Sequence, residues 1–100
     1  MFLKVAEDGA MTLEDSENFE SFSIVPDRAG MTLPESFHDI AEDAGEGRFW
    51  LEADAVVRFS KHVGNPKWEA QFWEMLAEAE PHGYADLERR LVKAHLEPPT

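Results

Sequence analysis

The sequence lacks cysteine altogether, and this absence removes several kinds of chemistry. Without thiols there is no disulfide bridge, no thiolate metal site and no cysteine nucleophile. The chain also lacks any apolar run approaching the roughly 20 residues of a membrane-spanning helix. Its first residues, 1–8, turn acidic too early for a secretory signal. These absences predict a soluble cytoplasmic protein that makes no use of a membrane.

The sequence also has few basic residues. Nine Lys and Arg face 21 Asp and Glu, so the net charge is −12. Residues 1–54 carry −11 of this charge and residues 55–100 carry −1. Such a field repels phosphate backbones, so nucleic acid is not an expected partner. The acidity serves solubility or favours a basic partner.

Patterns typical of catalysis are also missing. No serine stands in a Gly-x-Ser-x-Gly elbow or a Ser-x-x-Lys frame. Gly45 and Gly47 lie among acidic residues and match no phosphate-binding loop. His38 and Glu42 have the spacing of two metal ligands on a helix, but no third ligand joins them. The sequence therefore predicts a non-catalytic protein without metal or cofactor, with a small enzyme as the alternative.

The strongest pattern that is present is a helix over residues 65–80. Asn65 can cap it, and Pro66 fits its first turn, where the missing N–H has no cost. Pro81 and Gly83 end it. An apolar stripe at helical spacing predicts that this helix anchors the core. The stripe consists of Trp68, Phe72, Met75, Leu76 and Ala79.

The N-terminal half reads mainly as strands. Residues 1–6 and 10–13 predict a hairpin whose three-residue loop ends on Gly9 in a left-handed conformation. That register pairs Leu3 with Leu13 and Val5 with Met11 on one face. Residues 19–25 predict a third strand. Residues 48–52 are a short run rich in aromatic residues, and they predict a fourth strand.

Two further helices and an ambiguous tail complete the chain. Residues 33–44 predict a helix that ends at a glycine cap, and residues 55–63 predict another with Asp54 as its cap. Residues 84–96 fit both a helix and a strand, and their helix formers favour mostly helix. The sum is one α+β domain over residues 1–100. In it, a small, mostly antiparallel sheet of three to four strands packs on three to four helices.

Two surfaces are candidates for function. Trp73 lies off the apolar stripe between the small residues Ala70 and Ala77, as expected for contact with a protein partner or a second copy of the chain. Alternatively, the C-terminal segment covers it through Tyr84, Leu87 or Leu91. A second hypothesis places a ligand pocket between sheet and helices. Its lining would be Trp50, Trp68, Phe72, Tyr84 and His82.

Overall fold

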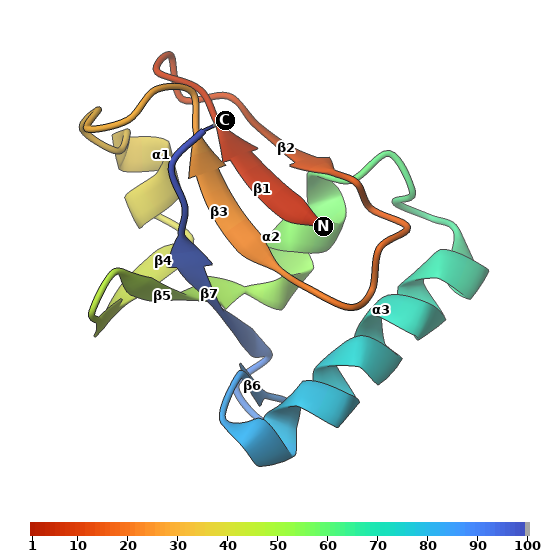
Figure 1. Ribbon diagram of the computed structural model, residues 1–100. Helices are drawn as coiled ribbons and strands as arrows, with labels where there is room; N and C mark the ends of the chain where they lie inside the picture. The colour runs from red at the N-terminus through yellow and green to blue at the C-terminus, as the bar shows by residue number, and fades with distance from the viewer. Residues whose placement is uncertain (100) are drawn as a thin grey trace.

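The computed structural model describes residues 1–99 and shows one small domain built from short strands and three α-helices (Figure 1). The strands are β1 (Phe2–Val5), β2 (Met11–Glu14), β3 (Ser23–Pro26), β4 (Ala41–Gly45), β5 (Arg48–Glu52), β6 (Ala85–Asp86) and β7 (Leu91–Leu96). The helices are α1 (Glu35–His38), α2 (Ala53–Arg58), α3 (Pro66–Ala79) and the 3₁₀ turn η1 (Glu80–His82).

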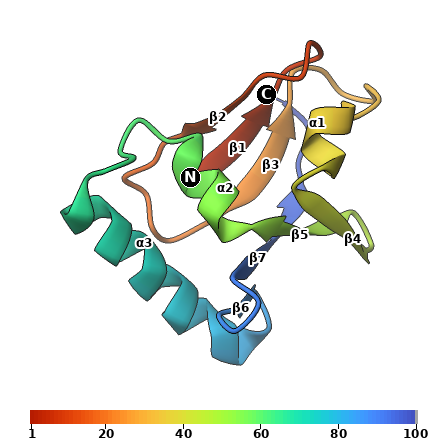
Figure 2. The same ribbon diagram turned by 180° about the vertical axis from the view of Figure 1, so that it is seen from behind.

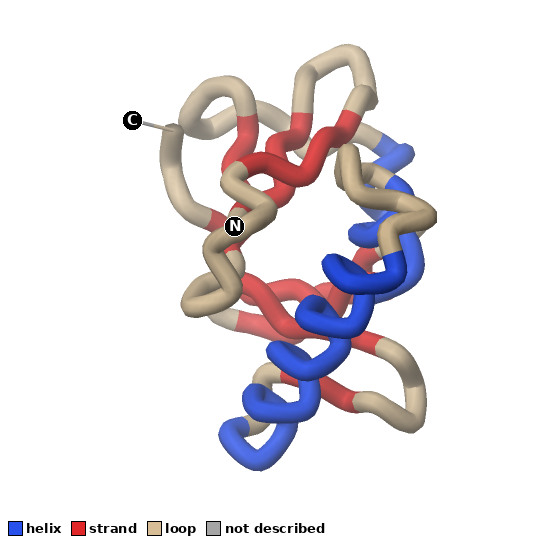
Figure 3. Tube along the Cα trace, turned by 90° about the vertical axis from the view of Figure 1, so that its right-hand side faces the viewer, coloured by secondary structure: helices blue, strands red, loops and turns tan. Residues whose placement is uncertain are grey.

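All seven strands belong to one mixed sheet in the order β2-β1-β3-β7-β5-β4, with β6 added beside β7. The pairs β1·β3 and β3·β7 are parallel, and the other pairs are antiparallel. Helix α2 lies behind β1 and β3 in Figure 1 and in front of them in Figure 2, so it covers one face of the sheet. Figure 3 shows the strands in an upper and a lower group, with the long helix α3 passing the lower group. The sheet is therefore strongly twisted around its core.

The predicted fold class is wrong. The sheet has seven strands of mixed direction rather than three or four mostly antiparallel ones, and α3 is the only described helix longer than six residues. Parallel pairing arises because the loop after β2 carries the chain across to the far side of β1. There, β3 begins in the same direction as β1.

Residues 84–96 account for part of the difference between the predicted and the observed fold. Residues 84–96 do not form a helix. They form β6 and β7, together with the residues that connect these strands to each other and to η1. Within β7, Val92 and Ala94 are buried while Lys93 and His95 are not, which is the alternation of a strand. Arg90 takes a left-handed φ of 57°, which breaks any helix there and forms the turn into β7. Pairing with β5 along five residues outweighs the local helix propensity.

The helix predicted over residues 33–44 is also cut short. It ends at His38, and residues 41–45 form β4, which pairs with β5 as a hairpin. Glu46 adopts a φ of 56°, and Gly45 and Gly47 are also left-handed, so the chain reverses there instead of extending a helix. Helix α2 also starts and ends earlier than predicted, at Ala53 and Arg58.

Other predictions are confirmed. The first hairpin pairs Leu3 with Leu13 and Val5 with Met11, and Gly9 has a φ of 96°. Asn65 caps α3 by accepting hydrogen bonds from the backbone N–H groups of Lys67 and Trp68. The apolar stripe of α3 faces the core, where Trp68, Phe72 and Leu76 are buried.

Candidate binding groove

A groove of about 580 Å³ opens where the sheet divides. Strand β5 pairs with one edge of β7. On the other edge, β6 pairs with the start of β7 and β3 pairs with its end. The groove is lined by residues that precede β3 and β6, by β7 itself and by the end of α3. Figure 1 shows how these elements are arranged. The full lining of the groove is Phe19, Glu20, Ser21, Phe22, Glu46, Gly47, Arg48, Met75, Leu76, Ala79, Tyr84, Val92, Lys93, Ala94, His95 and Leu96.

One side of the groove is apolar. We call it the apolar wall, and it consists of Phe19, Phe22, Met75, Leu76 and Ala79. The helical members belong to the last turns of α3, where the stripe passes beyond the buried core. The two phenylalanines come from the loop between β2 and β3. All members except Leu76 are only partly buried, so this wall still shows apolar surface.

Two exposed apolar side chains lie at this groove. Only three large hydrophobic residues are classed as exposed among residues 1–99: Val63 at 60%, Tyr84 at 48% and Leu96 at 38%. Two of the three, Tyr84 and Leu96, line the groove. Exposed apolar residues that line one groove of a small domain are typical of an interaction site.

Strands β5 and β7 supply a second side, the cationic wall, which consists of Arg48, Lys93 and His95. Arg48 and His95 are directly opposite each other in the antiparallel register, and Lys93 is two residues along β7. Directly paired residues, and residues two apart on a strand, project from the same face. The three basic side chains therefore share the sheet face that carries Trp50, opposite the buried Leu51 and Val92, and border the groove from that face.

The members of the cationic wall differ in their contacts. The Lys93 ammonium lies 4.7 Å from the centre of the Trp50 ring, a cation–π contact. His95 Nε2 is 2.6 Å from Glu97 Oε1. Arg48 makes no side-chain hydrogen bond or ion pair with any residue in the described part of the chain. Among the three, Arg48 is the one whose charged group has neither an ion pair nor a cation–π contact within residues 1–99.

The structure does not bring the five predicted pocket residues into one cavity. Tyr84 lines the groove, and His82 lies exposed in η1. Trp68 and Phe72 stack on each other in the core, with ring centres 5.4 Å apart. Trp50 projects from β5 on the face opposite the buried Leu51, because successive residues of a strand alternate.

Trp68 also borders a second, shallower hollow. His62 stacks on one side of its ring at 5.2 Å, Phe72 stacks at 5.4 Å, and Phe19 tilts against it at 6.1 Å. Only 4% of Trp68 is exposed, so its ring faces are not free to hold a ligand. His62 Nε2 is buried without a hydrogen-bond partner within residues 1–99. The second hollow is a packing feature of the α3 start.

Trp73 is contacted by the C-terminal segment, as in the alternative prediction, and the contacting residue is Arg90. The Arg90 guanidinium lies 4.2 Å from the centre of the Trp73 ring and donates two hydrogen bonds, of 2.7 and 2.8 Å, to the Asp54 carboxylate. These bonds hold the pKa of Asp54 below its ordinary value. Trp73 is partly buried, while Ala70 and Ala77 are exposed. Contact of this surface with another chain stays a prediction.

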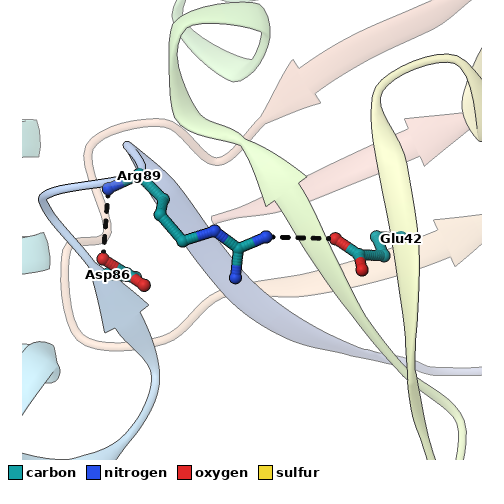
Figure 4. A network of polar contacts seen from close by, with 3 residues as sticks. All are labelled: Glu42, Asp86 and Arg89. Carbon is teal, nitrogen blue, oxygen red and sulfur yellow. Dashed lines mark hydrogen bonds and ion pairs between the residues drawn. The ribbon is translucent and has the colours of Figure 1, made fainter.

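A neighbouring pair ties the turn before β7 to the sheet edge. Arg89 Nη2 lies 3.3 Å from Glu42 Oε2, and Asp86 Oδ1 accepts a 3.1 Å bond from the Arg89 backbone N–H (Figure 4). Glu42 belongs to β4 and His38 ends α1, so the two are not one turn apart on a helix as the spacing suggested. Within residues 1–99 no three metal-ligating side chains gather at one point.

Searches of protein-family models, curated proteins and solved structures find no match to this chain. No helix within residues 1–99 is long and apolar enough to cross a bilayer.

Proposed function

We propose that this chain is a non-catalytic, cytoplasmic binding domain that recognises another protein, and that the groove is its binding site. The occupant we assign is a segment of the partner that inserts apolar side chains against the apolar wall. The absence of cysteine supports a reducing compartment. The cytoplasmic location is part of the proposal.

The exposure of Tyr84 and Leu96 at one groove carries this proposal. Binding energy at protein interfaces concentrates in a few apolar and aromatic anchors that fill pockets. A groove of about 580 Å³ accommodates one or two such anchors. Because much of its lining belongs to α3 and β7, the site rests on regular structure and needs little ordering when a partner binds.

The first experiment compares Tyr84, an exposed groove residue, with Val63, the exposed hydrophobic residue among residues 1–99 that lies outside the groove. A photo-crosslinking amino acid is placed at Tyr84 in one protein and at Val63 in another, and both are irradiated with a random-peptide phage library. We expect adducts and enriched peptides at Tyr84 and not at Val63. Equal labelling at the two positions would contradict the proposal.

A binding measurement on the enriched peptides then tests the anchors. The double variant Tyr84→Ser/Leu96→Ser should lose most of the affinity, and Val63→Ser should keep it. Circular dichroism establishes that each variant is folded. Light scattering coupled to size exclusion shows whether the partner is a second copy of the chain, and a dimer that persists in the Tyr84→Ser/Leu96→Ser variant would place self-association elsewhere.

A further inference from the structure

We infer that the segment bound in the groove carries a carboxylate, from an Asp, a Glu or a chain end, beside its apolar anchors. The inference rests on the proposed function and names the chemistry of the partner. In this arrangement the apolar side chains occupy the apolar wall, and the carboxylate meets the cationic wall with Arg48 as its main contact.

The placement of the cations is the first support. The chain has only nine Lys and Arg against 21 Asp and Glu. Even so, Arg48 and His95 are cross-strand partners, with Lys93 next along the same face. A carboxylate of this chain already pairs with His95, since Glu97 Oε1 lies 2.6 Å from His95 Nε2. Within residues 1–99 no carboxylate pairs with Arg48, so the partner's carboxylate is assigned to Arg48.

The free guanidinium is the second support. Three of the five arginines, Arg28, Arg89 and Arg90, form ion pairs with carboxylates of this chain. Arg48 and Arg58 do not form one within residues 1–99, and of these two only Arg48 lines the groove. A guanidinium with unused donors can bind a carboxylate through two parallel hydrogen bonds. Lys93 and His95 already have contacts and would add charge rather than the main bonds.

The net charge of −12 is not carried by the groove. The groove lining holds two carboxylates, Glu20 and Glu46, and two permanent cations, Arg48 and Lys93, so its formal charge is zero. The remainder of the chain therefore carries the whole −12. The groove is a neutral region in an acidic surface, where a carboxylate meets no net repulsion at contact distance.

This arrangement predicts an unusual salt dependence. The acidic remainder of the chain repels an anionic segment at long range, so added salt should speed association. The contact with Arg48 is screened at the same time, so added salt should also speed dissociation. Stopped-flow measurements with a labelled peptide separate the two rates.

Peptides enriched at Tyr84 provide the probe, and they are resynthesised with each acidic residue changed to its amide. Loss of the key carboxylate, or Arg48→Gln in the protein, should weaken binding by about tenfold or more. Arg58→Gln, the other arginine without an ion pair, is the matched control and should bind as the wild type does. Arg48→Glu should reject the acidic peptide and bind a peptide in which Lys replaces the carboxylate. That exchange of specificity is not expected if Arg48 is merely structural.

The outcomes separate the inference from the proposed function. Enrichment of peptides that are apolar but not acidic, or binding unaffected by Arg48→Gln, overturns the inference and leaves the groove as a protein-binding site. Failure to recover any peptide that depends on Tyr84 and Leu96 overturns both.

Discussion

Replacing Trp68 by Phe should destabilise the protein more than any other aromatic-for-aromatic exchange on α3. The Trp68 indole Nε1 donates a buried 2.7 Å hydrogen bond to the backbone carbonyl of Ser16, 52 positions away in the sequence. Its ring is stacked between His62 and Phe72. The side chain therefore joins the start of α3 to the acidic loop after β2.

The magnitude follows from these contacts. Phe cannot donate the hydrogen bond, and a buried carbonyl left without a donor costs about 1–3 kcal/mol. The smaller ring also gives up apolar contact and leaves a small void, which adds about 1 kcal/mol. The expected loss in the free energy of unfolding is about 2–4 kcal/mol, out of the roughly 5–15 kcal/mol typical of a small domain.

Urea unfolding followed by far-ultraviolet circular dichroism measures this loss, with two variants as controls. Ser16→Ala keeps the accepting carbonyl and should change little. Trp73→Phe makes the same exchange at a partly buried site whose indole N–H has no hydrogen bond among residues 1–99, and it should cost less than about 1 kcal/mol. Equal losses for Trp68→Phe and Trp73→Phe would refute the reasoning.

Two further predictions concern a turn and an ion pair. Gly9→Ala should destabilise more than Gly64→Ala in thermal unfolding. Both glycines have positive φ, but a Cβ at Gly9 would sit 3.0 Å from Ser36 Oγ, while nothing lies within 4 Å at Gly64. Equal shifts would contradict the contact with Ser36. The pKa of Asp54 is lowered by its bonds to Arg90, so the pair stabilises the fold above the ordinary value near 3.8 and stops doing so as the pH falls through the lowered one. Asp54→Asn should therefore flatten the acid side of a stability–pH curve, and an unchanged curve would count against it.

The elements that the sequence predicted correctly are those decided by neighbouring residues. The hairpin register follows from Gly9 and the alternation around it, and α3 follows from its cap, its proline and its stripe. The strands β4 and β7 were missed because their pairing with β5 exceeds a modest helix propensity. For β4 that pairing is a local hairpin with turn residues of left-handed φ, and for β7 it joins residues about 40 positions apart.

The groove was missed for the same reason. Its lining comes from five separate stretches of chain, which the pairings of β7 with β3, β5 and β6 and the packing of α3 bring together. Of the predicted pocket residues, Tyr84 alone lies in it. The one available signal was the alternation of Val92, Ala94 and Leu96 with polar residues, which indicates a strand with one face toward the interior.

The central place of β7 governs how the protein can be made. This strand is the last in the sequence, yet it alone joins the β2-β1-β3 group to the β5-β4 group. Until Leu91–Leu96 leaves the ribosome, the nascent chain holds two half-sheets with unpaired inner edges. Since such edges recruit other strands, the interval before β7 arrives is when this protein is most exposed to aggregation. The acidic N-terminal half, which keeps neighbouring nascent chains apart by repulsion, is synthesised first and so protects the chain during that interval.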